Sequence, residues 1–264
     1  MIVDYHMHLR APDESLDHSV EGVERFVEVA AEREIDEIGF AEHVYYFEQT
    51  RPLWTTASHV KHCHHDIEPY VEAVTEAKRQ GMPVKLGIEV DYVPRREEET
   101  AELLAPYPWD YLLGSIHFLG DAGIDGEPTL IEEVGVEAAW QRYYEALGHA
   151  AESKLFDSLA HPDLVRMHGP EIPWDWDAVA DSLEGACLEV SSAGLHKPHE
   201  KLYPNAELLA AAHERGRPIT LASDAHIPQN VGRDLDKAID HARAAGYDSV
   251  TVFDQRQSRQ QPLG

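Results

Sequence analysis

Short runs of β-branched and other apolar residues alternate along this chain with longer stretches in which apolar residues recur at helical spacing. The predicted strands are Ile2–Tyr5, Glu37–Phe40, Val84–Val90, Tyr111–Ile116, Asp157–Ala160, Ala186–Val190, Ile219–Ala222 and Ser249–Phe253. The predicted helices are Val20–Glu32, Ile67–Gln80, Val136–Ser153, Ala206–Arg215 and Val231–Ala245. This alternation predicts an α/β fold in which crossover helices connect the strands of a parallel sheet.

Histidines and acidic residues stand where the predicted strands end. Residues two apart in a strand project from the same face, so His6 and His8 can bind one ion together. The other residues of this kind are His43 in FAEH, Glu89 in GIEV, His117 in GSIH, His161 in SLAH, and Asp224 and His226 in ASDAH. Imidazole and carboxylate ligands suit Zn, Fe or Mn. The set exceeds the four ligands of one tetrahedral zinc ion and therefore predicts two or three ions that share a bridging carboxylate.

The positions of these residues favour a closed barrel over an open sheet. They come from many strands and always from the C-terminal end, and in a β/α barrel these ends converge on one mouth. About eight predicted strands fit such a barrel, and no GxGxxG turn of a dinucleotide-binding fold follows the first strand. Two stretches, Thr50–His65 and Leu119–Glu133, are expected to be long loops over the mouth.

Length and charge narrow the possible partners. The whole chain, residues 1–264, is predicted to form one barrel domain. The formal net charge of −27 argues against nucleic acid or an anionic membrane as a partner, because both favour a basic surface. Cys63 and Cys187 provide neither a disulfide framework nor a metal-binding pair. With no signal peptide or membrane-spanning run evident, a cytoplasmic location is expected, and the oligomeric state is left open.

The ordered motifs DYHMH, AEH, GIEVDY, DYLLGSIH, AHPDL, EVSSAG and SDAH resemble those of the polymerase and histidinol phosphatase (PHP) family. The resemblance extends over nearly the whole chain and is closest to the stand-alone histidinol-phosphate phosphatases. It implies a distorted TIM-like barrel of seven β/α units with a trinuclear metal centre at its C-terminal mouth. By the family pattern, the ligands of the first ion are His6, His8, Glu89 and Asp224. Glu89 bridges to a second ion, which His117 and His161 complete, and a third ion is bound by His43 and His226.

The third ion needs one more ligand, for which two residues compete. Family members place an Asp or His a few residues beyond the HxH pair, and Asp13 matches the Asp version. The preceding Arg10-Ala11-Pro12 departs from the family pattern, and His18 follows a little further on. Asp13 is favoured, because Ser19 has the character of a helix N-cap and ties His18 to the start of a helix.

A metal cluster of this kind suits the hydrolysis of a phosphate monoester. Clustered ions activate a water molecule and neutralise charge on the phosphoryl group and on the leaving oxygen. The predicted catalytic residues are Glu89, Asp224 and His226; either of the last two could move a proton, and the general acid is left unassigned. The predicted substrate-binding residues are Arg166, Lys197, Ser191 and Ser192. The two basic residues match positions of the related phosphatases. The plainer interpretation is that the two basic residues are solvated loop cations and that the two serines cap the end of a strand.

The resemblance implies hydrolysis of L-histidinol phosphate to L-histidinol and phosphate, a step of histidine biosynthesis, so a small phosphomonoester is the expected partner. Three alternatives stay open. The same site could act on another phosphoester such as a nucleotide or sugar phosphate, the barrel could carry out amidohydrolase chemistry, or the chain could be a non-catalytic, metal-dependent regulatory domain. Amidohydrolases usually bridge two ions with a lysine. Here Glu89 holds the bridging position and Lys85 lies earlier on the strand, which weakens that alternative.

Overall fold

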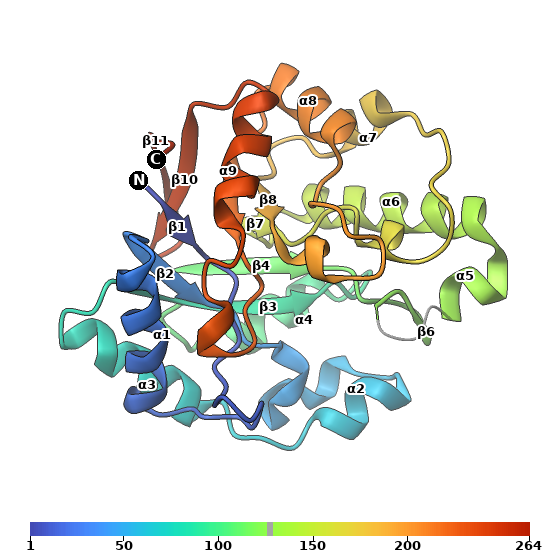
Figure 1. Ribbon diagram of the computed structural model, residues 1–264. Coiled ribbons are helices and arrows are strands. Elements are labelled where there is room, and N and C mark those ends of the chain that lie inside the picture. The colour runs from blue at the N-terminus through green and yellow to red at the C-terminus, as the bar shows by residue number, and fades with distance from the viewer. Residues whose placement is uncertain (126–128) are drawn as a thin grey trace.

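Seven parallel strands form the central sheet of the computed structural model, which describes residues 1–125 and 129–264 (Figure 1). In spatial order they are β1 (Val3–Asp4), β2 (Glu37–Phe40), β3 (Val84–Asp91), β4 (Tyr111–Ser115), β7 (Ser158–Leu159), β8 (Leu188–Ser191) and β9 (Ile219–Ala222). This is also their order along the chain, as expected for repeated strand–helix units. The strands β5 and β6 form a separate two-stranded sheet.

The two edges of this sheet approach each other and nearly close a barrel. The backbone N–H of Tyr5 donates to the carbonyl of Leu221 at 3.0 Å, and that of His8 donates to the carbonyl of Ala225 at 2.8 Å. Met7 and Ala225 form an isolated parallel bridge just beyond the ends of β1 and β9. The predicted seven-unit barrel is confirmed, and the C-terminal ends of its strands surround a common mouth.

The eighth predicted strand exists but lies outside the barrel sheet. It is β10 (Ser249–Asp254), which pairs antiparallel with β11 (Gln257–Pro262) near the N-terminus of the chain (Figure 1). Phe253 of β10 packs against the rings of Tyr5 and Tyr111, with centroids 5.7 and 5.5 Å away. The count of about eight barrel strands was therefore wrong by one, because this β-rich run covers the barrel instead of extending it.

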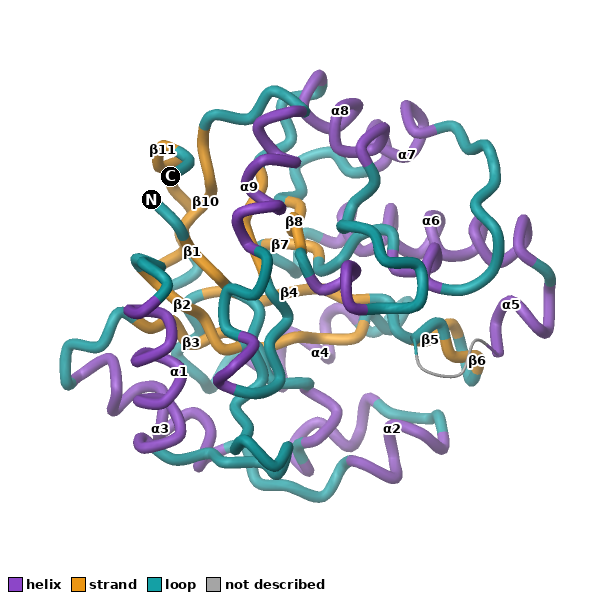
Figure 2. The backbone as a smooth tube through the Cα atoms, in the orientation of Figure 1, coloured by secondary structure: helices purple, strands orange, loops and turns teal. Residues whose placement is uncertain are grey.

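Helices surround the barrel, as the tube in Figure 2 shows. Their bounds are α1 (Val20–Glu32), α3 (Glu68–Arg79), α4 (Glu97–Leu104), α6 (Val136–Ser153), α7 (Trp176–Ser182), α8 (Ala206–Glu214) and α9 (Leu235–Ala244). Ser19 caps α1 by accepting a hydrogen bond from the Gly22 N–H, as predicted. The last helix begins four residues later than predicted, because a 3₁₀ turn over Pro228–Asn230 and the left-handed Asp234 precede it.

The two predicted loops contain short helices and strands that were not predicted from the sequence. The first, Thr50–His65, is part of residues 44–65, here called the mouth segment. This segment contains two 3₁₀ turns (Val44–Tyr46 and Glu48–Leu53), of which the first precedes the predicted loop, and α2 (Ala57–His62). The second loop contains the hairpin strands β5 (Phe118–Leu119) and β6 (Ala122–Gly123) and the helix α5 (Thr129–Val134). Residues 126–128 of that predicted loop lie outside the described part of the chain.

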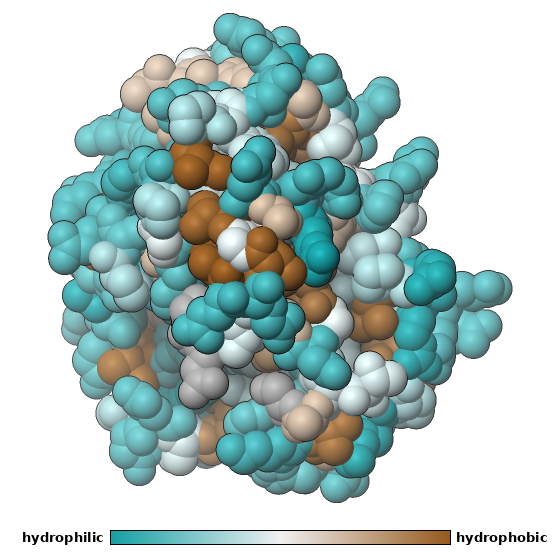
Figure 3. All heavy atoms as spheres, turned by 90° about the vertical axis from the view of Figure 1, so that its right-hand side faces the viewer, coloured by the Kyte–Doolittle hydropathy of each residue, from teal (hydrophilic) through white to brown (hydrophobic). Residues whose placement is uncertain are grey.

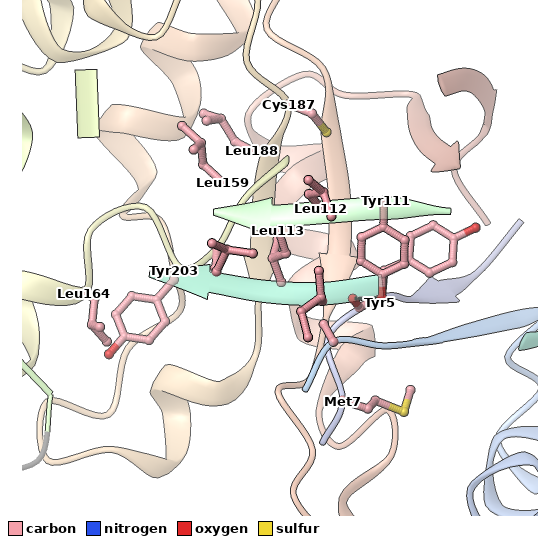
Figure 4. Packing of buried hydrophobic residues seen from close by; sticks show 14 of the residues in the cluster. Tyr5, Met7, Tyr111, Leu112, Leu113, Leu159, Leu164, Cys187, Leu188 and Tyr203 are labelled. Carbon is pink, nitrogen blue, oxygen red and sulfur yellow. Dashed lines mark hydrogen bonds between the residues drawn. The ribbon is translucent and has the colours of Figure 1, made fainter. Parts of the chain in front are cut away.

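Tyr111 packs beside Tyr5 in the buried core (Figure 4). It occupies space that two glycines leave open on neighbouring strands. A Cβ atom at Gly87 would lie 2.3 Å from the Tyr111 ring, and one at Gly39 would lie 2.4 Å from its hydroxyl oxygen. That hydroxyl donates to the carbonyl of Tyr5 at 2.6 Å, which links β4 to β1 across the barrel. A side chain at either glycine would displace Tyr111, so these small residues are required for the close packing of the core.

The surface is largely hydrophilic, in agreement with the acidic composition of the chain. The face shown in Figure 3 is mostly hydrophilic, with some hydrophobic atoms gathered near its centre. No large hydrophobic side chain is fully exposed among the described residues. The described helices are all too short or too polar to cross a membrane. Both cysteines are buried and free.

Candidate metal centre

Histidine and carboxylate side chains from six barrel strands converge at the mouth. Four overlapping groups have ligand atoms within 4.8 Å of one another: His8, His43 and His226; His6, Glu89 and His161; His6, His8 and Asp224; and His43, Glu89 and His117. Every member was among the predicted metal ligands. The predicted convergence is thus observed, and its cause is the parallel barrel, which brings the ends of distant strands together.

Glu89 lies at the centre of this arrangement. It belongs to the C-terminal half of β3, where a fully buried strand projects alternate side chains to one side. One carboxylate oxygen, Oε1, lies 3.2 Å from His161 Nε2 and 3.4 Å from His117 Nε2. The other, Oε2, lies 2.7 Å from His43 Nδ1 and 3.5 Å from His6 Nε2. His8 Nε2 also lies 3.8 Å from Oε2. The two oxygens therefore face different sets of histidines, which is the geometry expected of a carboxylate that bridges two ions.

Asp224 forms the other acidic part of the cluster. Its Oδ1 lies 3.3 Å from His8 Nε2, 3.7 Å from His6 Nε2 and 3.6 Å from His226 Nδ1. The backbone of Asp224 is left-handed, with φ of 53°, and that of His161 has φ of 26°. Non-glycine residues rarely adopt such conformations, and backbone strain of this kind gathers at functional sites.

The hydrogen bonding of the cluster tests whether these residues fit metal ions. Both oxygens of Glu89, Nε2 of His6 and His8, and Nδ1 of His43 are buried and have no hydrogen-bond partner among the described residues. Leaving one buried polar group unpaired costs about 1–3 kcal/mol, so five within one cluster need a common explanation. Their nitrogen and oxygen atoms are suitable ligands for Zn, Fe or Mn, and the residues present therefore fit such ions.

Three carboxylates hold the far sides of the candidate ligands. Glu189 Oε2 lies 2.7 Å from Nδ1 of His6, and Glu42 Oε2 lies 3.1 Å from Nδ1 of His8. Asp91 Oδ1 lies 3.1 Å from Nδ1 of His117. Such carboxylates fix the tautomer and orientation of a metal-binding imidazole. None of the three was predicted from the sequence. The available signal was an acidic residue inside a run of apolar strand residues, most clearly Glu189 in CLEV.

Burial and mutual charge shift the pKa values of this cluster. Burial, the largest single influence, raises the pKa of Glu89, but the charges of the surrounding histidines, above all His117 and His6, hold it well below its usual value. Burial lowers the pKa of His117, but the charges of Asp91 and Glu89 outweigh it and raise that pKa to about 10. Burial and the nearby His8 lower the pKa of His226 to about 3. The Glu89 carboxylate is thus held ionised, as metal binding requires, whereas His117 must release a proton to bind an ion.

Neither candidate for the remaining ligand of the third ion belongs to the four groups. Asp13 is exposed, and its carboxylate accepts hydrogen bonds from the hydroxyl and the N–H of Ser15. Nε2 of His18 lies 3.5 Å from Oε1 of Glu42, the residue whose other oxygen contacts His8. Asp13 as a ligand stays a prediction, and His18 acts in this structure on the outer side of the cluster.

The predicted substrate-binding residues lie around the mouth but differ in their surroundings. Arg166 is buried, with one terminal nitrogen 2.6 Å from Asp163 and the other 2.5 Å from Glu171. Lys197 is partly buried, and although burial lowers its pKa, the charges of Asp224, Asp125 and Glu89 raise it overall. The hydroxyl of Ser192 donates to the Arg233 carbonyl, and that of Ser191 accepts from the Ala193 N–H. Both serines therefore also stabilise the chain after β8.

Lys85 does not take part in the cluster. It lies near the start of β3, and its ammonium group is 2.8 Å from Asp254 and 3.7 Å from Glu37. A lysine that bridges two ions in the amidohydrolase manner would have to lie at the opposite end of the strand. Among the described residues, it is Glu89 that lies between the histidines of the cluster, which weakens the amidohydrolase alternative further.

A nearly closed parallel barrel with a histidine–carboxylate cluster at its C-terminal mouth defines a candidate metalloenzyme of the TIM-like class. The chain belongs to the PHP domain family, whose pattern matches residues 4–195. The family resemblance inferred from the motifs is thereby confirmed.

Curated relatives and solved structures extend this comparison. The chain is 34% identical to a probable histidinol-phosphatase of Deinococcus radiodurans over 200 residues, which cover 73% of this chain and 75% of that protein. It is 23% identical to the histidinol-phosphatase of Bacillus subtilis, with 79% and 88% covered. The crystal structure of histidinol phosphate phosphatase from Lactococcus lactis, complexed with Zn, L-histidinol and phosphate, superposes with a TM-score of 0.78. The alignment covers 98% of each chain at 20% identity, which supports the fold.

Proposed function

We propose that this protein hydrolyses L-histidinol phosphate to L-histidinol and phosphate, and that it does so with a cluster of divalent metal ions. The chemistry rests on one observation: the two oxygens of the Glu89 carboxylate face different sets of histidines. The substrate is supported by the curated relatives, which are named as histidinol-phosphatases, and by the L-histidinol and phosphate in the similar Lactococcus lactis structure.

The proposed centre contains two to three ions of Zn, Fe or Mn. Zinc is favoured by the similar structure, which was solved with Zn. His6, His8, Glu89 and Asp224 would hold one ion, and Glu89, His117 and His161 a second. The third would be held by His43, His226 and Asp13. When bound, such ions lower the pKa of a water molecule toward about 7 and neutralise negative charge on a phosphoryl group.

The protein's own residues orient the reacting groups. Glu89 fixes the spacing between the two sides of the cluster, and Glu189 and Glu42 hold His6 and His8 from behind. Asp224 and His226 lie 3.6 Å apart at the rim of the cluster and are placed to hold or pass a proton. This arrangement needs no additional strong base near the substrate.

Charged side chains around the mouth suit both ends of the proposed substrate. Lys197 presents a cation next to the cluster, where a phosphate would bind. Arg166 pairs with two carboxylates and would have to leave one of them before it could bind a phosphate. Asp125 lies near His117 and Lys197, whose charges lower its pKa although burial alone would raise it. We propose that this ionised carboxylate binds the amine or the imidazole of L-histidinol phosphate.

A phosphate-release screen tests the proposal. The protein loaded with zinc or manganese is assayed against L-histidinol phosphate, sugar phosphates, nucleotides and p-nitrophenyl phosphate, and a parallel assay uses N-acetylated amides. We expect phosphate release to be fastest with L-histidinol phosphate and no amide cleavage. Efficient turnover of a nucleotide or an amide, with L-histidinol phosphate inert, would contradict the assigned substrate.

A further inference from the structure

His59 is a buried histidine of the mouth segment that the proposed metal centre does not use. It lies in α2 (Figure 1), and only 4% of its surface is exposed. Its ring stacks on Trp54, with centroids 4.6 Å apart at 29°, and meets the edge of Phe118 at 4.5 Å. Its Nδ1 lies 2.6 Å from the hydroxyl of Thr56. These contacts fix the ring and determine the direction of the remaining nitrogen, Nε2.

That nitrogen faces Asp91 of β3. His59 Nε2 lies 3.7 Å from Asp91 Oδ2, and both atoms are buried without a hydrogen-bond partner among the described residues. A shift of about 1 Å by either side chain would bring this pair to the usual hydrogen-bond length of about 2.8 Å. Two facing, complementary and otherwise unpaired polar atoms in a buried place indicate that they act on each other.

The other oxygen of Asp91 leads directly to the metal centre. Asp91 Oδ1 lies 3.1 Å from Nδ1 of His117 and accepts a hydrogen bond from the His117 N–H at 3.2 Å. On the opposite side of the same imidazole, Nε2 lies 3.4 Å from Glu89 Oε1. The contacts therefore run from the mouth segment through His59, Asp91 and His117 to the bridging carboxylate.

We propose that His59 is a positioning residue: it holds Asp91, and thereby turns His117 toward the metal that this ligand shares with Glu89. The inference rests on the metal centre of the proposed function and adds a residue of the mouth segment to its support. A carboxylate held at one oxygen can rotate, whereas a contact at each oxygen fixes its plane and the imidazole it orients. Because coupling between two binding events is reciprocal, ions at the centre also stabilise the docked position of the mouth segment.

The alternative is that His59 serves only to pack between Trp54 and Phe118. Three substitutions separate the two roles. In His59→Gln, the amide nitrogen reaches the place of Nε2 and can still donate to Asp91. In His59→Asn, it reaches only the place of Nδ1, beside Thr56. His59→Leu fills the space without either polar contact.

The measured quantity is zinc retention by the folded protein against a graded series of chelators, with thermal unfolding recorded for each variant. We expect His59→Gln to retain zinc within about threefold of the wild type, and His59→Asn and His59→Leu to bind about 10–100-fold more weakly at one site. Saturating zinc should restore turnover to His59→Asn, because the defect lies in affinity. The matched control is the same set of substitutions at His62, a less buried residue of the same helix, which should leave zinc affinity unchanged.

Two results would overturn the inference. One is wild-type zinc affinity in folded His59→Asn. The other is equal weakening in His59→Gln and His59→Asn, since the nitrogen facing Asp91 would then not matter. If His59→Leu fails to fold, the Gln–Asn pair still decides, because both side chains are polar and differ mainly in reach. Failure of the wild type itself to bind zinc, manganese or iron would instead refute the metal centre of the proposed function.

Discussion

Glu189 Oε2 lies 2.7 Å from Nδ1 of His6, and the other nitrogen of the same imidazole points to Glu89 at 3.5 Å. The second oxygen of Glu189 accepts a hydrogen bond from the His161 N–H at 3.1 Å. One buried carboxylate on β8 thus positions candidate ligands from two other strands. Glu189 therefore supports two candidate ligands at once.

We therefore expect Glu189→Gln to weaken metal binding. An amide in this place keeps the size of the side chain but removes the charge that orients His6 and favours its binding to a cation. Losses of about 10–100-fold in metal affinity or activity are typical when such a partner is changed. Chelator competition measures the affinity, and Glu184→Gln, an exposed glutamate nearby, is the control. Equal zinc affinity in both variants would show that Glu189 has no such role.

Glu89→Gln should abolish turnover and leave the fold intact. The amide cannot bridge two ions, so the two sides of the cluster would no longer share one ligand. Circular dichroism tests the fold, and elemental analysis should show fewer than the two to three ions expected for the wild type. Wild-type turnover with a full metal content would mean that another residue is the bridge.

Removal of metal should lower the thermal stability of the protein. A ligand present at about 100 times its Kd stabilises the folded state by about 2.7 kcal/mol. For a chain of this size, that corresponds to a Tm change on the order of 5–10 °C. Differential scanning calorimetry with and without a chelator measures the change. Glu89→Gln should show a much smaller difference, and an unchanged Tm in the wild type would argue against ions held at the mouth.

Substitutions can show whether Asp13 or His18 is the remaining ligand, because the two side chains have different partners. If Asp13 completes the third ion, Asp13→Asn should lower occupancy of that ion and reduce kcat. His18→Gln should have little effect, because its amide nitrogen can still donate to Glu42 in the place of the imidazole Nε2. Ser15→Ala is the control for disturbing the Asp13 loop. The reverse pattern, with His18→Gln impaired and Asp13→Asn silent, would reassign the ligand.

Lys197 and Asp125 should affect different parts of the substrate. Lys197→Gln removes a cation beside the cluster and should raise KM for all phosphomonoesters by about 10–100-fold, the range expected for a charge-assisted contact. Asp125→Asn should raise KM for L-histidinol phosphate but leave that for p-nitrophenyl phosphate unchanged, since the latter has no amine. Parallel effects of both substitutions on both esters would show that Asp125 does not recognise the amine.

The strands and the candidate ligands could be predicted from the sequence where the local residue pattern agrees with the final position in the fold. The helices at Val20–Glu32 and Val136–Ser153 match the structure at both ends, because each has a strong apolar face. The candidate ligands were recognisable because His6, Glu89 and Asp224 stand at or near the ends of strands, and parallel topology brings such ends together.

What the sequence did not reveal depends on contacts between distant segments. Asp91 and Glu189 look like ordinary strand residues, and Glu42 like a residue just past a strand, until the barrel places each one behind a histidine. The β10 strand has a barrel-like pattern, but it pairs with β11 and covers the rings of Tyr5 and Tyr111 instead. Short elements such as α2 have too few residues for their periodicity to be read.

The most direct test of this account is the ratio of kcat/KM for L-histidinol phosphate to that for p-nitrophenyl phosphate, measured with the zinc-loaded protein. A site that pairs the polar groups of its substrate should discriminate strongly against an ester that leaves those groups unpaired. We predict a ratio of at least roughly 10², which corresponds to about 2.7 kcal/mol of transition-state stabilisation. A ratio near or below one would contradict the assignment of L-histidinol phosphate as the substrate.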